Sequence, residues 1–324
     1  MRVSWLIPVR DGGAWLAEAV DSALAQCSPG DEVIVVDDGS RDGAVEALAD
    51  TPFLHRLHQP PEGIVAALER GRSAAKGELI ARLDADDVAL PGRIEAQKQM
   101  FLAEPRLGAV GGRARIHRDG EAVPDGMQRY VSWLNELQDL HASRLVESPL
   151  FHPAVTFRAS AVKEVGGYED GPFPEDYDLW LRLVAGGWGL QSTDREVVVL
   201  RDRPDRLTRT DERYSREAFR EARRRHLRAV LPRCRVVLWG AGRSGKPWVR
   251  FFLAEGHDLV AVLDIGRATE RHGVPVLPPP SLATLEFDRL FVAVGIPEAR
   301  DEIRTLIQKL RPELVEGEHW FALA

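Results

Sequence analysis

Residues 75–87 read Ala-Lys-Gly-Glu-Leu-Ile-Ala-Arg-Leu-Asp-Ala-Asp-Asp, and this stretch does most to decide the fold class. The apolar run from Glu78 to Leu83 is typical of a buried strand, and three carboxylates follow it. Asp84 and Asp86, spaced i and i+2 beyond a strand, can converge on one hard cation such as Mg²⁺ or Mn²⁺. Loop acids that cap the next helix are the plainer explanation of the same residues.

Strands alternate with helices on both sides of this stretch. Two apolar runs rich in β-branched residues precede it, Val3 to Val9 and Glu32 to Val36, and helical patterns occupy 15–25 and 63–75. This alternation predicts an α/β fold with a mostly parallel sheet. Such sheets bind ligands at the carboxyl ends of their strands, which is where the acids of 84–87 lie. Their position therefore favours a metal site over a simple cap.

The remaining elements divide the chain into two parts. The predicted strands are 108–110, 155–157, 235–239, 259–263 and 290–294. The predicted helices are 131–143, 175–185, 211–231 and 297–310, together with one that follows Gly245 and ends at 255. The composition changes after the basic helix at 211–231. We therefore predict a first domain at 1–210, a basic helical linker at 211–233 and a second domain at 234–324.

The overall composition of the chain limits which binding partners and cellular locations we expect. The formal net charge of −7 argues against nucleic acid. Cys27 and Cys234 form no CxxC pair, so we expect neither a disulfide nor a zinc site. No apolar run is long enough to span a membrane, and we expect a cytoplasmic protein. The basic helix is either a solvated linker or a peripheral contact with the inner face of the membrane. The sequence does not give the oligomeric state.

Five segments follow one another in a recognisable order. They are Ile7-Pro8-Val9, 33–40 with its Asp-Asp-Gly-Ser turn, 75–87 with its Asp-Ala-Asp triplet, 152–158 with 166–168, and 174–182 with Glu-Asp at a helix start. Together they resemble the inverting family 2 glycosyltransferases over residues 3 to about 185. One departure is Pro61-Glu62-Gly63, where many members carry Asn before Gly. The resemblance implies the nucleotide-sugar-binding fold called GT-A, and transfer of a sugar from a nucleotide-sugar, commonly a UDP-sugar, to an acceptor hydroxyl.

The resemblance also implies roles for single residues. Asp176 would be the general base that takes the proton of the acceptor hydroxyl, and Glu175 would contact or orient the acceptor. Asp86 would bind Mn²⁺ or Mg²⁺ directly, and Asp84 would bind the metal through water or bind the ribose. The alternative for the Glu-Asp pair is that both are first-turn acids favoured by the helix dipole.

Three further positions complete the site that the resemblance implies. Asp38 would accept a hydrogen bond from the nucleotide base, and the backbone near Pro8 and Val9 would line the base pocket. His152 would assist at the diphosphate or hold the acceptor loop. Turn propensity alone also explains Asp38. The acceptor would be a carbohydrate, a lipid-linked sugar or a small molecule.

A second motif lies beyond the basic helix. Gly240, Gly242 and Gly245 form GxGxxG between a predicted strand and helix, and Asp264 ends the next strand. This context is that of a Rossmann-like nucleotide site, with NAD(P) or another nucleotide as ligand. The alternative is a structural or partner-binding domain whose glycines permit tight packing. A nicotinamide-dependent enzyme that modifies a nucleotide-sugar is accordingly the second candidate function.

Overall fold

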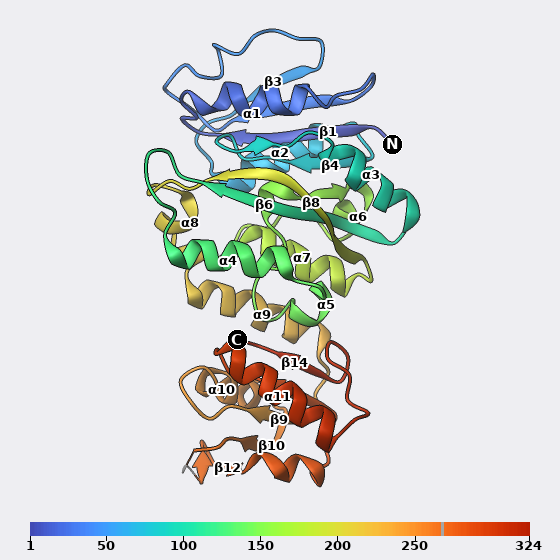
Figure 1. Cartoon of the computed structure of the whole chain (residues 1–324), viewed down its shortest axis with the longest axis vertical. Helices are drawn as coiled ribbons and strands as arrows, with labels where there is room; N and C mark the ends of the chain where they lie inside the picture. Colours follow the sequence, from blue (N-terminus) through green and yellow to red (C-terminus); the bar gives the residue numbers. More distant parts are fainter. Residues whose placement is uncertain (267–268) are drawn as a thin grey trace. The chain divides into compact units, whose positions relative to one another are not determined.

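A computed structural model describes residues 1–266 and 269–324 (Figure 1). It divides into two compact units, each with its own sheet. The first unit comprises Met1–Gln138 and Pro149–Ala222, and the second comprises Asp139–Ser148 and Arg223–Ala324.

The first unit contains an eight-stranded sheet with the order β3-β2-β1-β4-β7-β6-β8-β5. Neighbours are parallel from β3 to β4 and between β6 and β8, and antiparallel elsewhere. The predicted α/β class with a mostly parallel sheet is confirmed. The strands are β1 (Val3–Val9), β2 (Glu32–Asp37), β3 (Leu54–His58), β4 (Leu79–Arg82), β5 (Val88–Ala89), β6 (Leu107–His117), β7 (Thr156–Arg158) and β8 (Gly189–Arg201).

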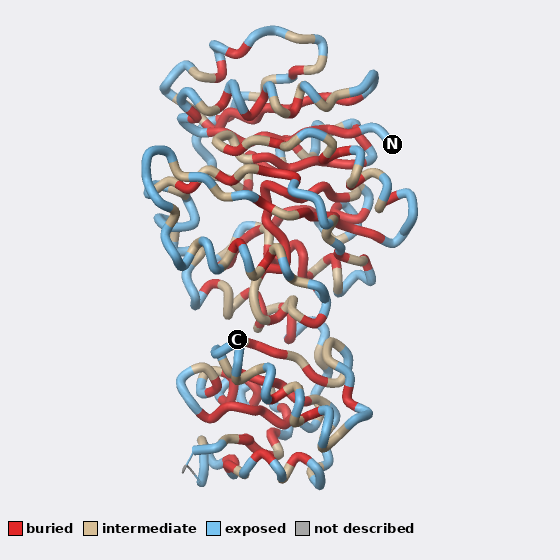
Figure 2. The backbone as a smooth tube through the Cα atoms, in the orientation of Figure 1, coloured by how far each residue is buried: buried red, intermediate tan, exposed pale blue. Residues whose placement is uncertain are grey.

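The inner strands of this sheet are buried along their whole length rather than at alternate residues, as expected for strands covered on both faces. Every residue of β1 and β2 is buried, and Figure 2 shows buried backbone along the strands. Gly71 lets the helix α2 (Ile64–Ala74) pack closely against β1, because a Cβ at position 71 would lie 2.0 Å from Cδ1 of Leu6. The helices of this unit are α1 (Trp15–Leu24), α2 (Ile64–Ala74), α3 (Arg93–Ala103), α4 (Asp125–Glu136), α6 (Ala159–Glu164), α7 (Glu175–Ala185) and α8 (Leu207–Thr210), with 3₁₀ turns η1 (His152–Ala154) and η2 (Glu212–Tyr214).

Two predicted helices differ from the observed ones. The helix predicted at 131–143 is two helices, α4 and the short α5 (Leu140–Ser143), because Asp139 starts a new one by accepting a hydrogen bond from the amide of Ala142. The helix predicted at 211–231 begins later, as α9 (Arg216–Val230), after the turn η2. The division between the two units falls inside α9, after Ala222.

The second unit contains a six-stranded sheet with the order β11-β12-β10-β9-β13-β14, parallel except for the β11–β12 pair. A Rossmann-like half sheet has this arrangement. Its apolar core includes Trp239, Leu263 and Trp320. The elements are β9 (Arg235–Trp239), α10 (Lys246–Ala254), β10 (Asp258–Leu263), β11 (Glu270–Arg271), β12 (Val274–Leu277), η3 (Pro279–Ala283), β13 (Arg289–Val292), α11 (Pro297–Leu310) and β14 (Trp320–Ala322). Among the described residues of both units, no helix is long and apolar enough to cross a bilayer.

Candidate functional site

The carboxyl ends of β1, β2 and β4 meet at one edge of the first sheet. Val9 is in register with Asp37, and Leu6 with Arg82. The Asp-Asp-Gly-Ser turn and the Asp-Ala-Asp triplet both follow these strand ends. Parallel pairing therefore brings together two motifs that lie more than 40 positions apart in the chain.

Three carboxylates form what we call the acidic cluster: Asp84, Asp86 and Asp87. Each contributes an oxygen that lies within 4.8 Å of the others. Asp87 is almost wholly buried, and its Oδ1 accepts a hydrogen bond of 2.8 Å from the amide of Arg201. Its buried Oδ2 has no hydrogen-bond partner among residues 1–266 and 269–324. A group of crowded oxygens with an unsatisfied acceptor suits a hard divalent cation.

Burial and mutual repulsion act on the protonation of this cluster. Burial raises the pKa of Asp86, and the charge of Asp84 adds to this effect, while Arg206 and Arg203 oppose it. For Asp87, burial followed by the charge of Asp84 holds the pKa well above the ordinary range. Because a cation would favour the ionised forms, these shifts describe a site that gains from positive charge.

Guanidinium groups surround the acidic cluster. Arg82 Nη1 lies 2.5 Å from Asp84 Oδ1, Arg203 Nε lies 3.6 Å from Asp86 Oδ2, and Arg206 Nη2 lies 4.0 Å from Asp84 Oδ2. Sequence reasoning missed these arginines as site residues. The arginines that recur over 201–206 were the only pattern in the sequence that could have indicated them, and that pattern shows a basic segment without showing what it contacts.

The pairing of β5 with β8 brings Arg203 and Arg206 to the acidic cluster. In the antiparallel pair of β5 and β8, Val88 is opposite Val199, so the chain beyond β8 runs alongside the acidic cluster. Arg201 marks the contact, since its Nη1 donates a hydrogen bond of 2.6 Å to the carbonyl oxygen of Asp86. The short strand β5 thus fixes where the following segment lies.

Asp38 anchors a loop. Its buried carboxylate accepts hydrogen bonds from Nε2 of Gln59 and from the amides of Glu62 and Gly63, at 2.8 to 3.1 Å. Its own amide donates to the carbonyl of Val9 at 2.9 Å. The loop it holds is the one that departs from the family pattern. Pro8 and Val9 end β1 beside it, and both are buried. A base contact by Asp38 stays a prediction, because its acceptor capacity is largely taken by this loop.

Glu175 begins α7 and is buried. The hydroxyl of Tyr214 lies 2.9 Å from each of its carboxylate oxygens, and Arg213 Nη1 lies 3.9 Å from Oε2. Burial raises the pKa of Glu175, although the hydrogen bond from Tyr214 opposes the rise. Sequence reasoning assigned Glu175 to the acceptor but did not foresee Tyr214 as its partner.

Asp176, the next residue, is partly buried. Burial and then the charge of Glu175 raise its pKa to about 8, while a hydrogen bond from the amide of Tyr177 opposes the rise. A carboxylate that titrates near neutral pH is well matched to taking a proton from a hydroxyl. Arg82 acts on both parts of the site, because it pairs with Asp84 and its charge favours the ionised form of Asp176.

His152 lies behind Glu175 rather than in the open. It is buried, its Nε2 lies 2.8 Å from the hydroxyl of Tyr168, and its Nδ1 lies 3.9 Å from Oε1 of Glu175. Burial, followed by the charge of Arg82, lowers its pKa well below the usual value. The hydrogen bond with Tyr168 holds the His152 ring in place, and a contact with the diphosphate stays a prediction.

Comparison with known proteins assigns the family. Residues 4–166 match the model of glycosyl transferase family 2, which is half of the chain. The chain belongs to this family. It is similar to the amylovoran biosynthesis glycosyltransferase AmsE of Erwinia amylovora, with 29% identity over 53% of this chain and 65% of the relative. It is also similar to UDP-Gal:alpha-D-GlcNAc-diphosphoundecaprenol beta-1,3-galactosyltransferase of Escherichia coli, with 28% identity over 60% of this chain and 71% of that one.

The solved structure of S. aureus TarS 1-349 in complex with UDP-GlcNAc shares the fold. Its TM-score is 0.52 at 18% identity, over 70% of this chain and 65% of TarS 1-349. The expected GT-A fold is thereby confirmed. The chain spans 65% of the length of AmsE and 27 to 31% of the length of three other curated relatives. The relatives named here are glycosyltransferases, so they give no support to the nicotinamide-dependent alternative.

The larger part of the second unit, Arg223–Ala324, lies outside the residues that match the family model, and its glycine loop is held by internal contacts. Gly240 has φ of 116°, and a Cβ at Gly245 would lie 1.7 Å from the carbonyl oxygen of Gly240. Gly242, in contrast, has open space where its Cβ would be. Asp264 Oδ2 accepts a hydrogen bond of 2.6 Å from the amide of Ala241. The structure therefore brings the four predicted residues together. Two of the glycines and Asp264 have packing roles, and nucleotide binding stays untested.

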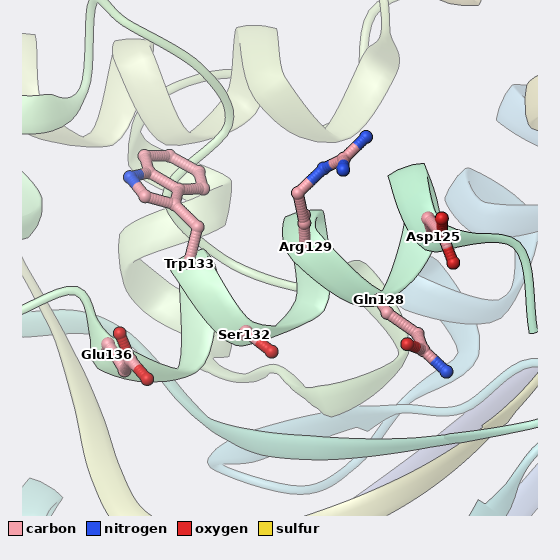
Figure 3. Close-up of a pocket in the computed structure, with 6 residues that line it drawn as sticks. All are labelled: Asp125, Gln128, Arg129, Ser132, Trp133 and Glu136. Atoms are coloured by element: carbon pink, nitrogen blue, oxygen red, sulfur yellow. The ribbon is translucent and has the colours of Figure 1, made fainter. Parts of the chain in front are cut away.

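Two surface hollows are lined by residues other than the predicted site. One, of about 480 Å³, lies along the outer side of α4, where Trp133 and Arg129 project from successive turns (Figure 3). Its remaining lining residues are Asp125, Gln128, Ser132 and Glu136. The other, of about 610 Å³, lies near Met1 and Leu102. Neither includes the acidic cluster.

Proposed function

We propose that this chain is an inverting glycosyltransferase that moves a sugar from a UDP-sugar to an acceptor hydroxyl, with a divalent metal at the acidic cluster and Asp176 as the general base. One observation carries the proposal. The acidic cluster follows a strand end of the first sheet, and the Glu175–Asp176 pair is tied to it electrostatically through Arg82.

The residues of the acidic cluster fit Mn²⁺ or Mg²⁺. They supply only oxygen ligands, within a few ångström of one another, and Asp87 Oδ2 is a buried acceptor that a cation would satisfy. Asp86 would be the direct ligand, because Asp84 is already paired closely with Arg82 and would reach the metal through water. When bound, the metal would supply Lewis-acid stabilisation of the diphosphate leaving group. A UDP-sugar donor is supported by the name of the Escherichia coli relative, a UDP-Gal-dependent galactosyltransferase.

Asp176 would perform the proton transfer. As the acceptor oxygen forms its bond to the anomeric carbon, the bond from that carbon to the diphosphate breaks and the hydroxyl proton passes to Asp176. Attack from the face opposite the diphosphate inverts the configuration. The Glu175 carboxylate, held by Tyr214, would position the acceptor and keep the pKa of Asp176 high. Among acceptors, the name of the Escherichia coli relative favours a lipid-linked sugar over a small molecule.

Calorimetric binding tests the donor site. UDP, GDP and dTDP are titrated, each with and without Mn²⁺, into wild type and Asp86→Ala, with the exposed carboxylate variant Asp125→Ala as the matched control. We expect one diphosphate to bind with Mn²⁺, the binding to be lost in Asp86→Ala and kept in Asp125→Ala. Equal binding to all three proteins would place the nucleotide elsewhere and refute the proposal.

A further inference from the structure

A short loop follows α6 and leads towards α7. Residues 165–169 read Val-Gly-Gly-Tyr-Glu, and we call them the bridging loop. Gly166 and Gly167 have φ of 93° and 79°, and the amide of Gly167 donates a hydrogen bond of 2.9 Å to the carbonyl of Val162, which closes the end of α6. The chain turns sharply here, and charged side chains from two other helices hold the loop.

Glu69 of α2 holds the bridging loop from one side. Its Oε1 accepts a hydrogen bond of 2.6 Å from the amide of Tyr168. The carboxylate is oriented by Arg72, whose Nε and Nη2 donate to it at 2.7 to 3.0 Å in a two-pronged, charge-assisted pair. A Cβ at Gly167 would lie 2.6 Å from Oε1, so this close approach requires glycine at that position. Glu69 is therefore a fixed acceptor for the loop backbone.

Arg182 of α7 holds the same loop from the other side. Its Nη1 donates a hydrogen bond of 2.6 Å to the carbonyl oxygen of Val165, and its Nε lies 3.6 Å from Glu169. Nε also donates at 2.7 Å to Asp178, a buried acid in the first turn of α7. Arg182 thus joins the bridging loop to the start of the helix that carries the proposed base.

The side chain of Tyr168 extends this connection into the core. Its hydroxyl lies 2.8 Å from Nε2 of His152, and its ring meets Phe157 edge-on with centroids 6.2 Å apart. His152 in turn packs edge-on against Trp180 of α7 at 5.9 Å. Because packed rings transmit displacement, a shift of Tyr168 also acts on α7 through these contacts.

The other helix in this connection, α2, begins on the donor side. The amide of its first flanking residue, Gly63, donates a hydrogen bond of 3.0 Å to the carboxylate of Asp38. The bridging loop therefore links a helix that starts beside the predicted base-binding residue to a helix that starts with the proposed catalytic base. In a transfer between two bound substrates, a misplacement of about 1 Å can cost about 10²-fold in rate.

We propose that Glu69 and Arg182 are positioning residues for the transfer: through the bridging loop they fix the start of α7, with the Glu175–Asp176 pair, relative to α2. The inference rests on the proposed function, because it takes Asp176 as the base. Neither side chain touches a substrate. Their loss therefore lowers turnover without removing a group that binds the nucleotide.

The kinetic test compares Glu69→Ala, Arg182→Gln and the double variant. The probes are UDP-Gal and alpha-D-GlcNAc-diphosphoundecaprenol, the substrates that the name of the Escherichia coli relative gives. Each single variant should lower kcat/KM for the acceptor by about 10- to 10²-fold, while UDP binding with Mn²⁺ stays near wild type. The double variant should be worse than either single one by less than about threefold, because both act through one loop. Glu69→Gln keeps an acceptor for the Tyr168 amide and should recover much of the loss, and Arg70→Ala, exposed on α2, should change nothing.

Hydrogen exchange of the full chain tests the same link without an acceptor. In Glu69→Ala, the amide of Tyr168 loses its acceptor and should exchange about tenfold faster than in wild type or Arg70→Ala. The amides of Tyr177 and Asp178, hydrogen-bonded at the start of α7, should exchange faster with it. Faster exchange at Tyr168 alone would overturn the inference, because the loop would then not hold α7.

The possible results separate the inference from the proposed function. A less stable Glu69→Ala with unchanged kcat/KM would overturn the inference and leave the function standing. A wild-type protein that binds no UDP in the presence of Mn²⁺ would overturn the proposed function itself. If wild type does not use this pair of substrates, the exchange pattern decides. If a variant does not fold, Glu69→Asp, whose shorter side chain withdraws the carboxylate from the loop, or Arg182→Lys is measured in its place.

Discussion

The carboxyl edges of the two sheets are built from different kinds of residue. In the first unit, β4 is followed by the acidic cluster, where burial and repulsion raise the pKa values of Asp86 and Asp87. In the second unit, β9 is followed by a glycine loop whose nearby carboxylate, Asp264, accepts hydrogen bonds from the amides of Ala241 and Gly266. The first edge carries charge that its surroundings do not fully satisfy, whereas the second satisfies its polar groups internally.

This difference bears on which of the two motifs indicates a function. Unsatisfied buried charge is costly to stability and tends to be found where a ligand or a reaction makes use of it. Internally satisfied turns are common in structural roles. The comparison therefore favours catalysis at the carboxyl edge of the first sheet. At the edge of the second sheet, packing is enough to explain most of the motif residues.

The largest effect should come from removing the proposed base. Asp176→Asn should lower turnover by between about 10²- and 10⁴-fold, because a general base contributes that much, while UDP binding with Mn²⁺ stays near wild type. In wild type, kcat/KM should rise with pH towards about 8 as Asp176 loses its proton. Steady-state kinetics with any accepted donor and acceptor measure both. An Asp176→Asn variant with full turnover would show that another group is the base.

The next effect tests the packing at the second edge. Gly245→Ala should lower the free energy of unfolding by about 3 kcal/mol, because the new Cβ would collide with the backbone oxygen of Gly240. Gly242→Ala, three residues earlier and with open space at the Cβ position, is the matched control and should change stability by less than about 0.5 kcal/mol. Denaturant unfolding of the full chain measures both. Equal effects of the two substitutions would mean that the loop is not held by this contact.

A smaller effect is expected from the partner of Glu175. Tyr214→Phe removes the hydroxyl that lies 2.9 Å from both carboxylate oxygens, so a buried acceptor loses its donor. We expect the free energy of unfolding to fall by about 1 to 2 kcal/mol. Thermal and denaturant unfolding of wild type and Tyr214→Phe test this. No loss of stability would indicate that the Glu175 carboxylate is satisfied without Tyr214.

The last prediction concerns how the free energy of unfolding changes with pH. The folded protein holds a proton on Asp176 up to about pH 8, whereas the unfolded chain loses it near the usual value of 3.8, so ionisation costs stability as pH rises between these values. Asn cannot ionise. Asp176→Asn should therefore be more stable than wild type at pH 8, and the gain should shrink as the pH falls and disappear near pH 4. A stability difference that is the same at both pH values would contradict the raised pKa.

The sequence by itself determined the fold class and most elements of the first sheet. Runs such as Val3–Val9 and Glu32–Asp37 are mostly apolar, without strict alternation, because both faces of the strand are covered, and this is a local signal. The glycosyltransferase motifs are also local, and the family match over 4–166 confirms the family they indicate. Weak segments were missed for the same reason. The strand β3, Leu54–His58, has a mixed pattern that only pairing with β2 stabilises.

Only the tertiary structure decided which charges meet. The pairing of β5 with β8 carries Arg203 and Arg206 to the acidic cluster, from residues more than 100 positions later in the chain. The turn η2 brings Tyr214 to Glu175 from 39 positions away. Hydrophobic periodicity reports burial one residue at a time, but electrostatic partners depend on strand register and loop path. The sequence could therefore name the acids of the site, and the fold alone supplied the arginines and the tyrosine that act on them.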